Sequence, residues 1–480
     1  MRKTLFILLV MIGLVRCQVV DVLDFDPMYE LDLEGAITTP DMAELALNGC
    51  YSYLPSTSIN YLFTTTSGAF QAGAMLRASC VTSGNTIYYS ERYLPTLTYS
   101  SFGDDEWECD YNVIKNVNYL LTALDGIAES DFEEGRKDEI IGECHFLQGL
   151  AYFRLLRQFG QYWDTTSTYG VLIRDELPAI ANGEKARATV GESYAEIFRH
   201  LDIADSLAPQ YSAPTQASVQ ASKALRAVAY FYQGDYGNAL AAVNEAITST
   251  NPLAGSYLDV FTNAETCSEV IFCRAFGSDE ESLMSYYPAR AFSNGNWGPT
   301  DTYMDLIEGD ARKDLVTSEV DFTYSDSTYR VRVASKMYPA GEAVPVIFMR
   351  TAELYLIKAE CLARTGASIS EAWAPVRELR LRGGNTDVTE PATQDELMDE
   401  IFREWWIEMA FENWHEWFAV QRFDRLLEMN ETLAEDYQEE LEAGESFADA
   451  FLQELEYHKI YNIPSGETEA NPACVENPGY

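Results

Sequence analysis

The fold is decided by residues 221–247, which read ASKALRAVAYFYQGDYGNALAAVNEAI. Ala227 and Ala239 are small residues at helical spacing on either side of a turn at Gly234, and Tyr230 and Tyr236 accompany them. Small side chains let two antiparallel helices approach closely, while the tyrosine rings fill the remaining gaps. The stretch therefore predicts a tight helical hairpin.

A second stretch, residues 354–379, repeats this arrangement, with Ala359 at an equivalent place. Two such units, at the spacing of tetratricopeptide repeats, predict a partial helical-repeat scaffold. Residues 143–159 add a helix with apolar residues at helical spacing. We therefore expect a mainly α protein whose packed antiparallel helix pairs occupy residues 143–250 and 350–425.

Two irregular segments, 52–105 and 275–345, are rich in Ser, Thr, Gly, Asn and Tyr and lack clear helical periodicity. Such segments form loops or short strands, and long loops on a rigid scaffold commonly carry ligand contacts. A third segment, 429–457, has no Lys or Arg, and its mixture of apolar and acidic residues predicts a solvated helix face.

The irregular segments supply the residue types that a carbohydrate site uses. Aromatic rings stack on sugar faces, and amides pair with hydroxyl groups. The candidate ligand-binding residues are Tyr88, Tyr89, Tyr93, Tyr286, Tyr287, Phe292, Asn294, Asn296 and Trp297. Trp297 is the strongest of them, because flanking Gly and Pro favour a turn that presents its ring to solvent. For each residue, packing beneath its own loop is the alternative.

The N-terminus has the layout of a signal peptide, with Arg2 and Lys3 followed by the apolar stretch TLFILLVMIGLV. Cys17 comes directly after the segment, as in bacterial lipoproteins, and is the predicted lipidation site. Acyl chains on this cysteine and on the new amino terminus would anchor the protein stably. The alternative is an ordinary signal peptide with a chance cysteine.

The composition narrows the class of function. The 480 residues include 76 acidic and 33 basic ones, and the net charge of −43 repels phosphate backbones, so nucleic acid is a poor partner. None of the cysteines forms a CxxC motif, and the four histidines are scattered, so no metal or cofactor is predicted. No catalytic motif of the common hydrolase or nucleotide-binding classes is present.

Several motifs occur in an order that is typical of one protein family. They are Trp107-x3-Tyr111-x2-Ile114-x3-Asn118, residues 143–160, MRTAELYLIKAE at 349–360, LRLRG at 379–383, IFREWWIEMAFENWHEWFAVQRF at 401–423 and ENPGY at 476–480. This succession resembles the SusD/RagB family of nutrient-binding outer-membrane lipoproteins. Trp405 and Glu416 stand where that family usually has arginine.

The resemblance implies an α-rich domain on tetratricopeptide-like helix pairs, with a loop-rich half that carries the ligand site. It also implies a partner, a TonB-dependent (SusC-like) transporter in the outer membrane. The expected organisation is a signal peptide at 1–16, a lipidated leader at 17–30, an N-terminal region at 31–260 and a C-terminal region at 261–480. The motif residues that we expect to cap helices or pair between them are Glu353, Glu360, Arg380, Arg382, Glu408 and Glu412.

Three functions remain open at this point. The first is a non-catalytic lipoprotein on the cell surface that delivers an oligosaccharide to the transporter. The second is a member of the same fold that binds a peptide or protein. The third is a glycoside-active enzyme, for which two suitably spaced carboxylates would suffice. Because no catalytic motif accompanies the acidic residues, we expect a binding protein.

Overall fold

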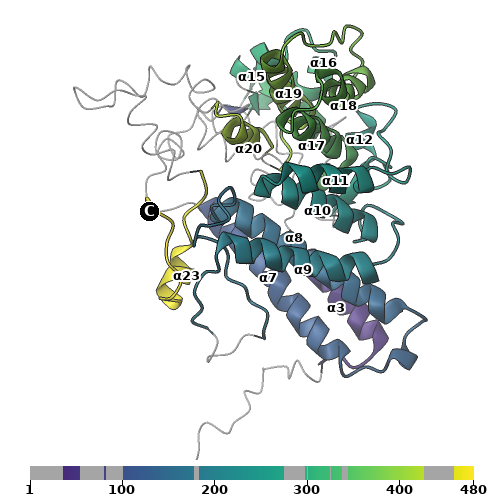
Figure 1. Cartoon of the computed structure of the whole chain (residues 1–480), viewed down its shortest axis with the longest axis vertical. Helices are drawn as coiled ribbons and strands as arrows, with labels where there is room; N and C mark the ends of the chain where they lie inside the picture. Colours follow the sequence, from purple (N-terminus) through teal and green to yellow (C-terminus); the bar gives the residue numbers. More distant parts are fainter. Residues whose placement is uncertain are drawn as a thin grey trace, which may run out of the picture.

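The computed structural model describes residues 36–54, 81–82, 101–177, 183–274, 298–299, 301–324, 326–337, 344–413, 415–425 and 459–480. These residues confirm the mainly α prediction. Antiparallel helices occupy both regions in which they were expected, 143–250 and 350–425. Short strands are also present, in the upper half of the molecule (Figure 1). The predicted lipidation site, all nine candidate ligand-binding residues and the acidic segment lie outside the described residues.

The lower half is a stack of long helices. Helix α8 packs against α7 on one side and α9 on the other, and α3 packs against α7 (Figure 1). The bounds are α3 Pro40–Ser52, α7 Ser101–Leu124, α8 Arg136–Phe159 and α9 Val190–Leu207. Helix α7 begins inside the segment predicted to be irregular up to residue 105. The structure corrects that bound, because residues 101–105 already belong to the helix.

Local chemistry explains where these helices begin and how closely they pack. Thr189 and Glu192 form a reciprocal capping box at the start of α9. Helix α8 starts at residue 136, after Gly135 in the left-handed region with φ 81°. At Gly142, a Cβ atom would lie 2.1 Å from the backbone nitrogen of Ala208, so only glycine permits this approach of α8 to the end of α9.

The predicted helical hairpin is present as α10 (Val219–Gln233) and α11 (Tyr236–Ala246). Gly234 adopts φ 81° at the turn, and the side chain of Asp235 accepts a hydrogen bond from the backbone of Asn238. Ala227 and Ala239 are fully buried. Helix α11 packs on α17, so the hairpin joins the lower and upper helices.

The upper helices are α17 Thr351–Arg364, α18 Ile369–Arg382, α19 Gln394–Glu408 and α20 His415–Arg422. Helices α17 and α18 form the second predicted hairpin, and α19 packs on both. Trp405 and Trp406 of α19 are fully buried, with the Trp405 ring stacked on Phe231 of α10 at a centroid distance of 5.9 Å. One continuous hydrophobic core therefore runs through both halves.

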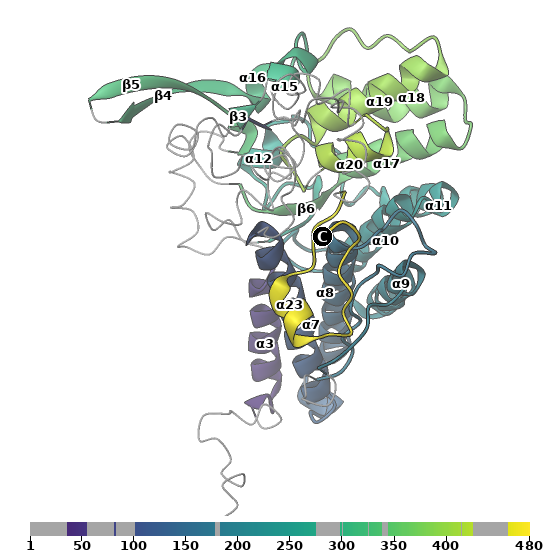
Figure 2. The ribbon, with the colours of Figure 1, turned by 90° about the vertical axis from the view of Figure 1, so that its left-hand side faces the viewer.

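Within the described residues, three two-stranded antiparallel sheets accompany the helices. Their strands are β1 Val81–Thr82, β2 Val270–Cys273, β3 Gly298–Pro299, β4 Ser318–Tyr324, β5 Ser327–Val333 and β6 Ile347–Arg350. β1 pairs with β3, β2 with β6 and β4 with β5. The β4–β5 hairpin projects from the body, as Figure 2 shows. Short helices in this half are α12 Asp259–Thr262, α15 Asp301–Leu306, α16 Lys313–Val316 and the 3-10 turn η5 Ser335–Met337.

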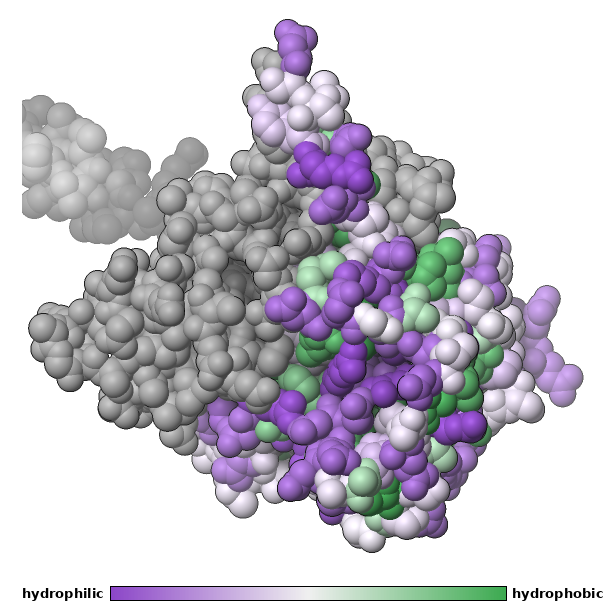
Figure 3. Space-filling view, turned by 90° about the horizontal axis from the view of Figure 1, so that it is seen from above, coloured by the Kyte–Doolittle hydropathy of each residue, from purple (hydrophilic) through white to green (hydrophobic). Residues whose placement is uncertain are grey.

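The described surface seen from above is mainly hydrophilic, with small apolar patches between polar residues (Figure 3). None of the helices in the described part of the chain is long and apolar enough to cross a membrane. Cys144 and Cys361 are free and fully buried, as expected for cysteines that behave as small hydrophobic residues.

Candidate functional site

The two irregular segments predicted to form the ligand site pair with each other at residues 81–82 and 298–299. Val81 pairs with Pro299, and Thr82 pairs with Gly298, in the antiparallel β1–β3 ladder. Strand β5 of the projecting hairpin lies against β3. Trp297 directly precedes Gly298 in the sequence. The pairing brings the flanks of the two loops together, although it leaves the roles of the candidate residues themselves as predictions.

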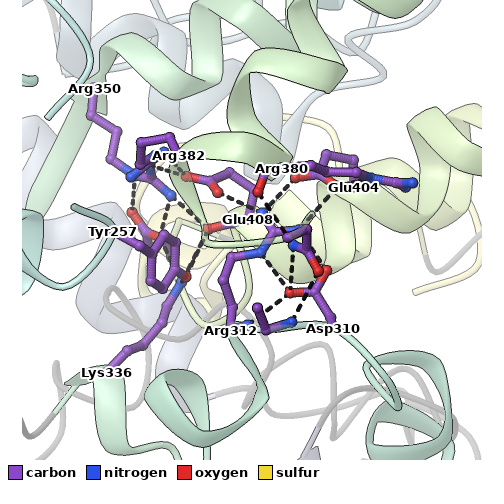
Figure 4. Close-up of polar contacts among 12 residues, drawn as sticks. Tyr257, Asp310, Arg312, Lys336, Arg350, Arg380, Arg382, Glu404 and Glu408 are labelled. Carbon is purple, nitrogen blue, oxygen red and sulfur yellow. Dashed lines mark hydrogen bonds and ion pairs between the residues drawn. The ribbon is translucent and has the colours of Figure 1, made fainter. Parts of the chain in front are cut away.

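A buried ionic network fixes this irregular half to the helices (Figure 4). Arg312, which follows α15, donates to Glu404 and Glu408 of α19 at 2.5 and 2.8 Å. Lys336 of η5 donates to Glu412 at 2.7 Å. Both cations are fully buried. The segments on either side of the β4–β5 hairpin are therefore bound to the scaffold by charged hydrogen bonds.

Arg350, at the end of β6, is the centre of the network. It donates to Glu269 at 2.9 Å, to Glu408 at 2.6 Å and to Glu412 at 2.8 Å. Arg382 of α18 also contacts Glu408. Each carboxylate thus faces at least one guanidinium or ammonium group, which is the arrangement that buried charges require.

These contacts set the protonation of the network. Burial by itself would raise the pKa of Glu408, but Arg382, Arg350 and Arg312 outweigh it and hold that pKa well below the ordinary glutamate value. Burial is likewise outweighed at Glu412 by Arg350 and Lys336, so the pKa of Glu412 is also lowered. Glu408 and Glu412 are therefore held ionised by the cations around them, and these charged hydrogen bonds are suited to holding segments in place.

A cavity of about 300 Å³ opens on the side of α7. One wall is a single face of α7, on which Trp107, Tyr111, Lys115 and Asn118 recur at helical spacing. The Trp107 and Tyr111 rings lie 4.6 Å apart between centroids. This wall is held to the chain opposite by Tyr111, whose hydroxyl both donates to and accepts from the backbone of Leu172 at 3.0 Å.

The opposite wall comes from residues 174–176, 183 and 185 and from Glu467 of α23 (Ser465–Ala470), which lies beside α7 in Figure 2. Arg174 donates to the Gly183 carbonyl at 3.0 Å and to Glu467 at 3.2 Å. Lys185 donates to Asp175 at 3.0 Å. The α7 residues could be recognised from the sequence as a helix motif, but the cavity could not, because its other wall lies 56 to 360 residues away along the chain.

His145 of α8 and His200 of α9 form a packing contact between these two helices. Nδ1 of His145 lies 2.8 Å from Nδ1 of His200, and the Tyr152 ring stacks on His200. Burial is the main cause that lowers the pKa of His145 to about 3, so the pair is neutral. Among the residues that the structure describes, no three His, Cys, Asp or Glu side chains are grouped so that they could hold a metal ion.

Comparison with known proteins decides the family. A model described as "SusD family" matches residues 276–480, and a model described as "Starch-binding associating with outer membrane" matches residues 80–233. The chain belongs to the SusD/RagB family. Among curated proteins, the SusD-like protein P2 of Formosa agariphila is 24% identical over 382 residues, which cover 67% of this chain and 73% of that relative.

Solved SusD-like structures share the fold. A putative sugar-binding protein from Bacteroides vulgatus superposes with a TM-score of 0.69 at 22% identity, over 93% of this chain and 99% of the other. A laminarin-binding SusD-like protein superposes with a TM-score of 0.67 at 19% identity, over 92% of this chain and all of the other (100%). At these identities, the likeness establishes the fold and no further property.

The SusD-like motif residues have the architectural contacts expected of them. Glu360 accepts hydrogen bonds from Arg364 at 2.8 Å and from Arg422 at 3.2 Å. Trp405 replaces the usual arginine and still reaches Glu360, because its indole N–H donates at 2.8 Å. Glu416, the other departure, accepts from the backbone N–H of Phe411. At both positions, the side chain that replaces arginine makes a hydrogen bond of its own.

Glu353 differs from the other motif carboxylates. The imidazole of His415 lies 3.9 Å away, and both side chains are almost fully buried. Burial lowers the pKa of His415 well below its ordinary value, so this ring is neutral and gives Glu353 no cationic partner. Burial raises the pKa of Glu353 to about 8, although Arg157 and Arg350 act in the opposite direction. The expected pairing of Glu353 between helices is therefore loose, and the group is mainly protonated at neutral pH.

The C-terminal motif packs on the scaffold. The Asn477 amide donates to the carbonyls of Phe159 and Tyr461 at 3.0 and 2.6 Å. Arg187 donates to Asn477 at 2.7 Å. Asn471 accepts from the backbone N–H of Lys185 and donates to its carbonyl, each at 2.9 Å. The tail thereby fixes one wall of the α7 cavity.

Proposed function

We propose that this SusD-like chain is a non-catalytic lipoprotein that captures an oligosaccharide at the outer membrane and passes it to a TonB-dependent transporter. The observation that carries the proposal is the match of both halves to family models, one of them described as starch-binding and outer-membrane-associated. The laminarin-binding neighbour has the same fold and supports a glycan as the ligand.

The proposed ligand surface lies where the two irregular segments meet. The β1–β3 pairing joins the segment that contains Tyr88, Tyr89 and Tyr93 to the segment that contains Trp297. Aromatic rings on joined loops would form a stacking platform for a hydrated, extended ligand. The buried network around Arg350 supports the proposal, because it holds the base of the second segment rigidly.

Titration of Trp297→Ala with oligosaccharides tests the site. The probes are laminarin and starch oligosaccharides, with a mixed peptide library as the competing ligand class. We expect the variant to lose about tenfold or more in affinity, because one stacking ring is removed. Trp163→Ala is the matched control: Trp163 is 39% exposed and belongs to neither loop.

Unchanged oligosaccharide affinity in a folded Trp297→Ala variant would remove this residue from the site. Binding of peptides and not of oligosaccharides by the natural chain would overturn the glycan proposal. Purification from detergent-solubilised outer membranes tests the partner, since a TonB-dependent transporter should be recovered together with the tagged chain.

A further inference from the structure

We propose that the cavity beside α7 binds a single neutral sugar ring, which adds a second carbohydrate contact point and rests on the proposed function. The cavity volume of about 300 Å³ is at the lower end of the range for small-ligand sites. Every lining residue named below belongs to the described chain, and none is among the residues predicted for the loop site.

The floor of the cavity offers an aromatic surface and a donor. Trp107 is only 7% exposed and is held edge-on against Phe159 at a centroid distance of 5.0 Å. Trp107 and Tyr111 both line the cavity, and an indole N–H can donate a hydrogen bond to a ligand hydroxyl. A ligand hydroxyl in the cavity would satisfy this donor while a ring face rests on the aromatic floor.

The charges around the opening select a neutral ligand. Arg174, Lys115 and Lys185 are opposed by Asp175, Glu176 and Glu467, so the lining is balanced in a chain whose net charge is −43. An anion would approach three carboxylates, and a cation would approach three basic groups. A hydroxyl both donates and accepts, so a sugar ring can pair with groups of either sign.

The walls are held in place before any ligand arrives. Arg174 is bound to Gly183 and Glu467, and the backbone of Lys185 is held on both sides by Asn471. Tyr111 is tied to Leu172 in the same way. A site that is ordered in advance loses less conformational freedom on binding, and this favours a small ligand with few contacts.

The test uses the full chain and ligand-observed saturation-transfer NMR with methyl glucoside and methyl galactoside. Glucuronate and glucosamine serve as charged comparators. Lys115→Trp places a bulky ring at an exposed position over the opening, and Trp107→Phe removes the indole N–H while keeping a ring. We expect about tenfold weaker binding of the neutral glycosides in each variant. Lys223→Ala on α10 is the control.

The outcomes separate this proposal from the loop site. Neutral glycoside binding that survives Trp297→Ala but is lost in Lys115→Trp supports the cavity. Glycoside binding that is unaffected by Lys115→Trp overturns it, as does tighter binding of either charged sugar. Oligosaccharide binding that depends on Trp297 without any glycoside signal overturns the cavity proposal alone. If Trp107→Phe fails to fold, the exposed Lys115→Trp variant decides the question.

Discussion

Arg350 shows how strongly one side chain can depend on its surroundings. It is fully buried and donates to three glutamates, so removing it takes a shared cationic partner from three buried carboxylates. We expect Arg350→Met to lower the free energy of unfolding by about 3–5 kcal/mol. Chemical denaturation followed by circular dichroism measures this loss.

Arg330→Met is the matched control for Arg350→Met. Arg330 bridges Glu319 and Asp321 on the β4–β5 hairpin, but its side chain is 58% exposed. Exposed ion pairs contribute only about 0–1 kcal/mol, so this variant should unfold almost like the natural chain. Equal losses in the two variants would contradict the assignment of the network as the stabilising group.

Glu353 predicts a specific dependence on pH. Its pKa in the folded chain is raised to about 8 from an ordinary value of 4.5, mainly because burial disfavours the charge. The folded state therefore holds a proton that the unfolded state releases, so this contribution to stability is complete below pH 4.5 and is lost as the pH rises through 8.

Glu353→Gln should remove that loss, because the amide cannot ionise. We expect the difference between the melting temperatures at pH 5 and pH 8.5 to be smaller in the variant than in the natural chain. The exposed Glu390→Gln serves as the control. An unchanged pH profile in Glu353→Gln would mean that Glu353 is ionised in the folded chain at neutral pH.

The sequence predicted which residues are architectural but not all of their partners. Glu408, Glu412, Arg380 and Arg382 belong to recognisable helix motifs, and all four lie in the ionic network. Arg312 and Lys336 lie in a segment without helical periodicity, so no spacing rule could connect them to helices more than 70 residues away. Long-range pairing of charges depends on the folded topology.

At the scale of elements, the close approach of α8 to the end of α9 leaves less room for a side chain at Gly142 than at any other described glycine. Gly142→Ala would place a Cβ atom 2.1 Å from the backbone nitrogen of Ala208, and backbone atoms cannot rotate away as a side chain can. We expect the two helices to be forced apart at a cost of about 1–3 kcal/mol. Thermal unfolding of the purified variant measures the effect.

Gly49→Ala should have the opposite effect on stability to Gly142→Ala, although both glycines lie in helices. Gly49 lies inside α3, and an added Cβ would meet no atom within 4 Å. Alanine is a better helix former than glycine, so this variant should be stabilised by up to about 1 kcal/mol. Stabilisation of both variants to the same extent would show that helix propensity, and not the contact with Ala208, decides the result.

Element boundaries were predicted well where the local signals were strong. The turn at Gly234 and the end of α8 at residue 159 follow from glycine positions in the sequence. The β4–β5 hairpin was not predicted as a separate element, although Val320 and Phe322 alternate with Glu319 and Asp321. Two short strands without a helix beside them give too weak a pattern to separate from loops.

At the scale of the whole molecule, the excess of acidic residues lies outside the ionic network, in which buried acids and bases pair closely. We propose that lipid on Cys17 attaches the chain to the membrane. Cys17→Ser should abolish acylation, so the chain should move from the detergent phase to the aqueous phase or remain unprocessed.

Phase partitioning and N-terminal sequencing of the mature chain measure the effect of Cys17→Ser. Substitution of a buried cysteine, Cys361→Ser, is the control and should leave partitioning unchanged in the folded fraction. A Cys17→Ser variant that is cleaved normally and still enters the detergent phase would show that the anchor lies elsewhere.

The docking of Asn477 has a consequence for the order in which the chain folds. Its contacts with Arg187 and Phe159 span 290 and 318 residues of sequence. Contacts of such long range form late, because a large loop must close before they can stabilise anything. We therefore expect the first helices to remain in a partly assembled, slowly exchanging state until synthesis reaches the last twenty residues, and a chaperone that shields this state would raise the yield of folded protein.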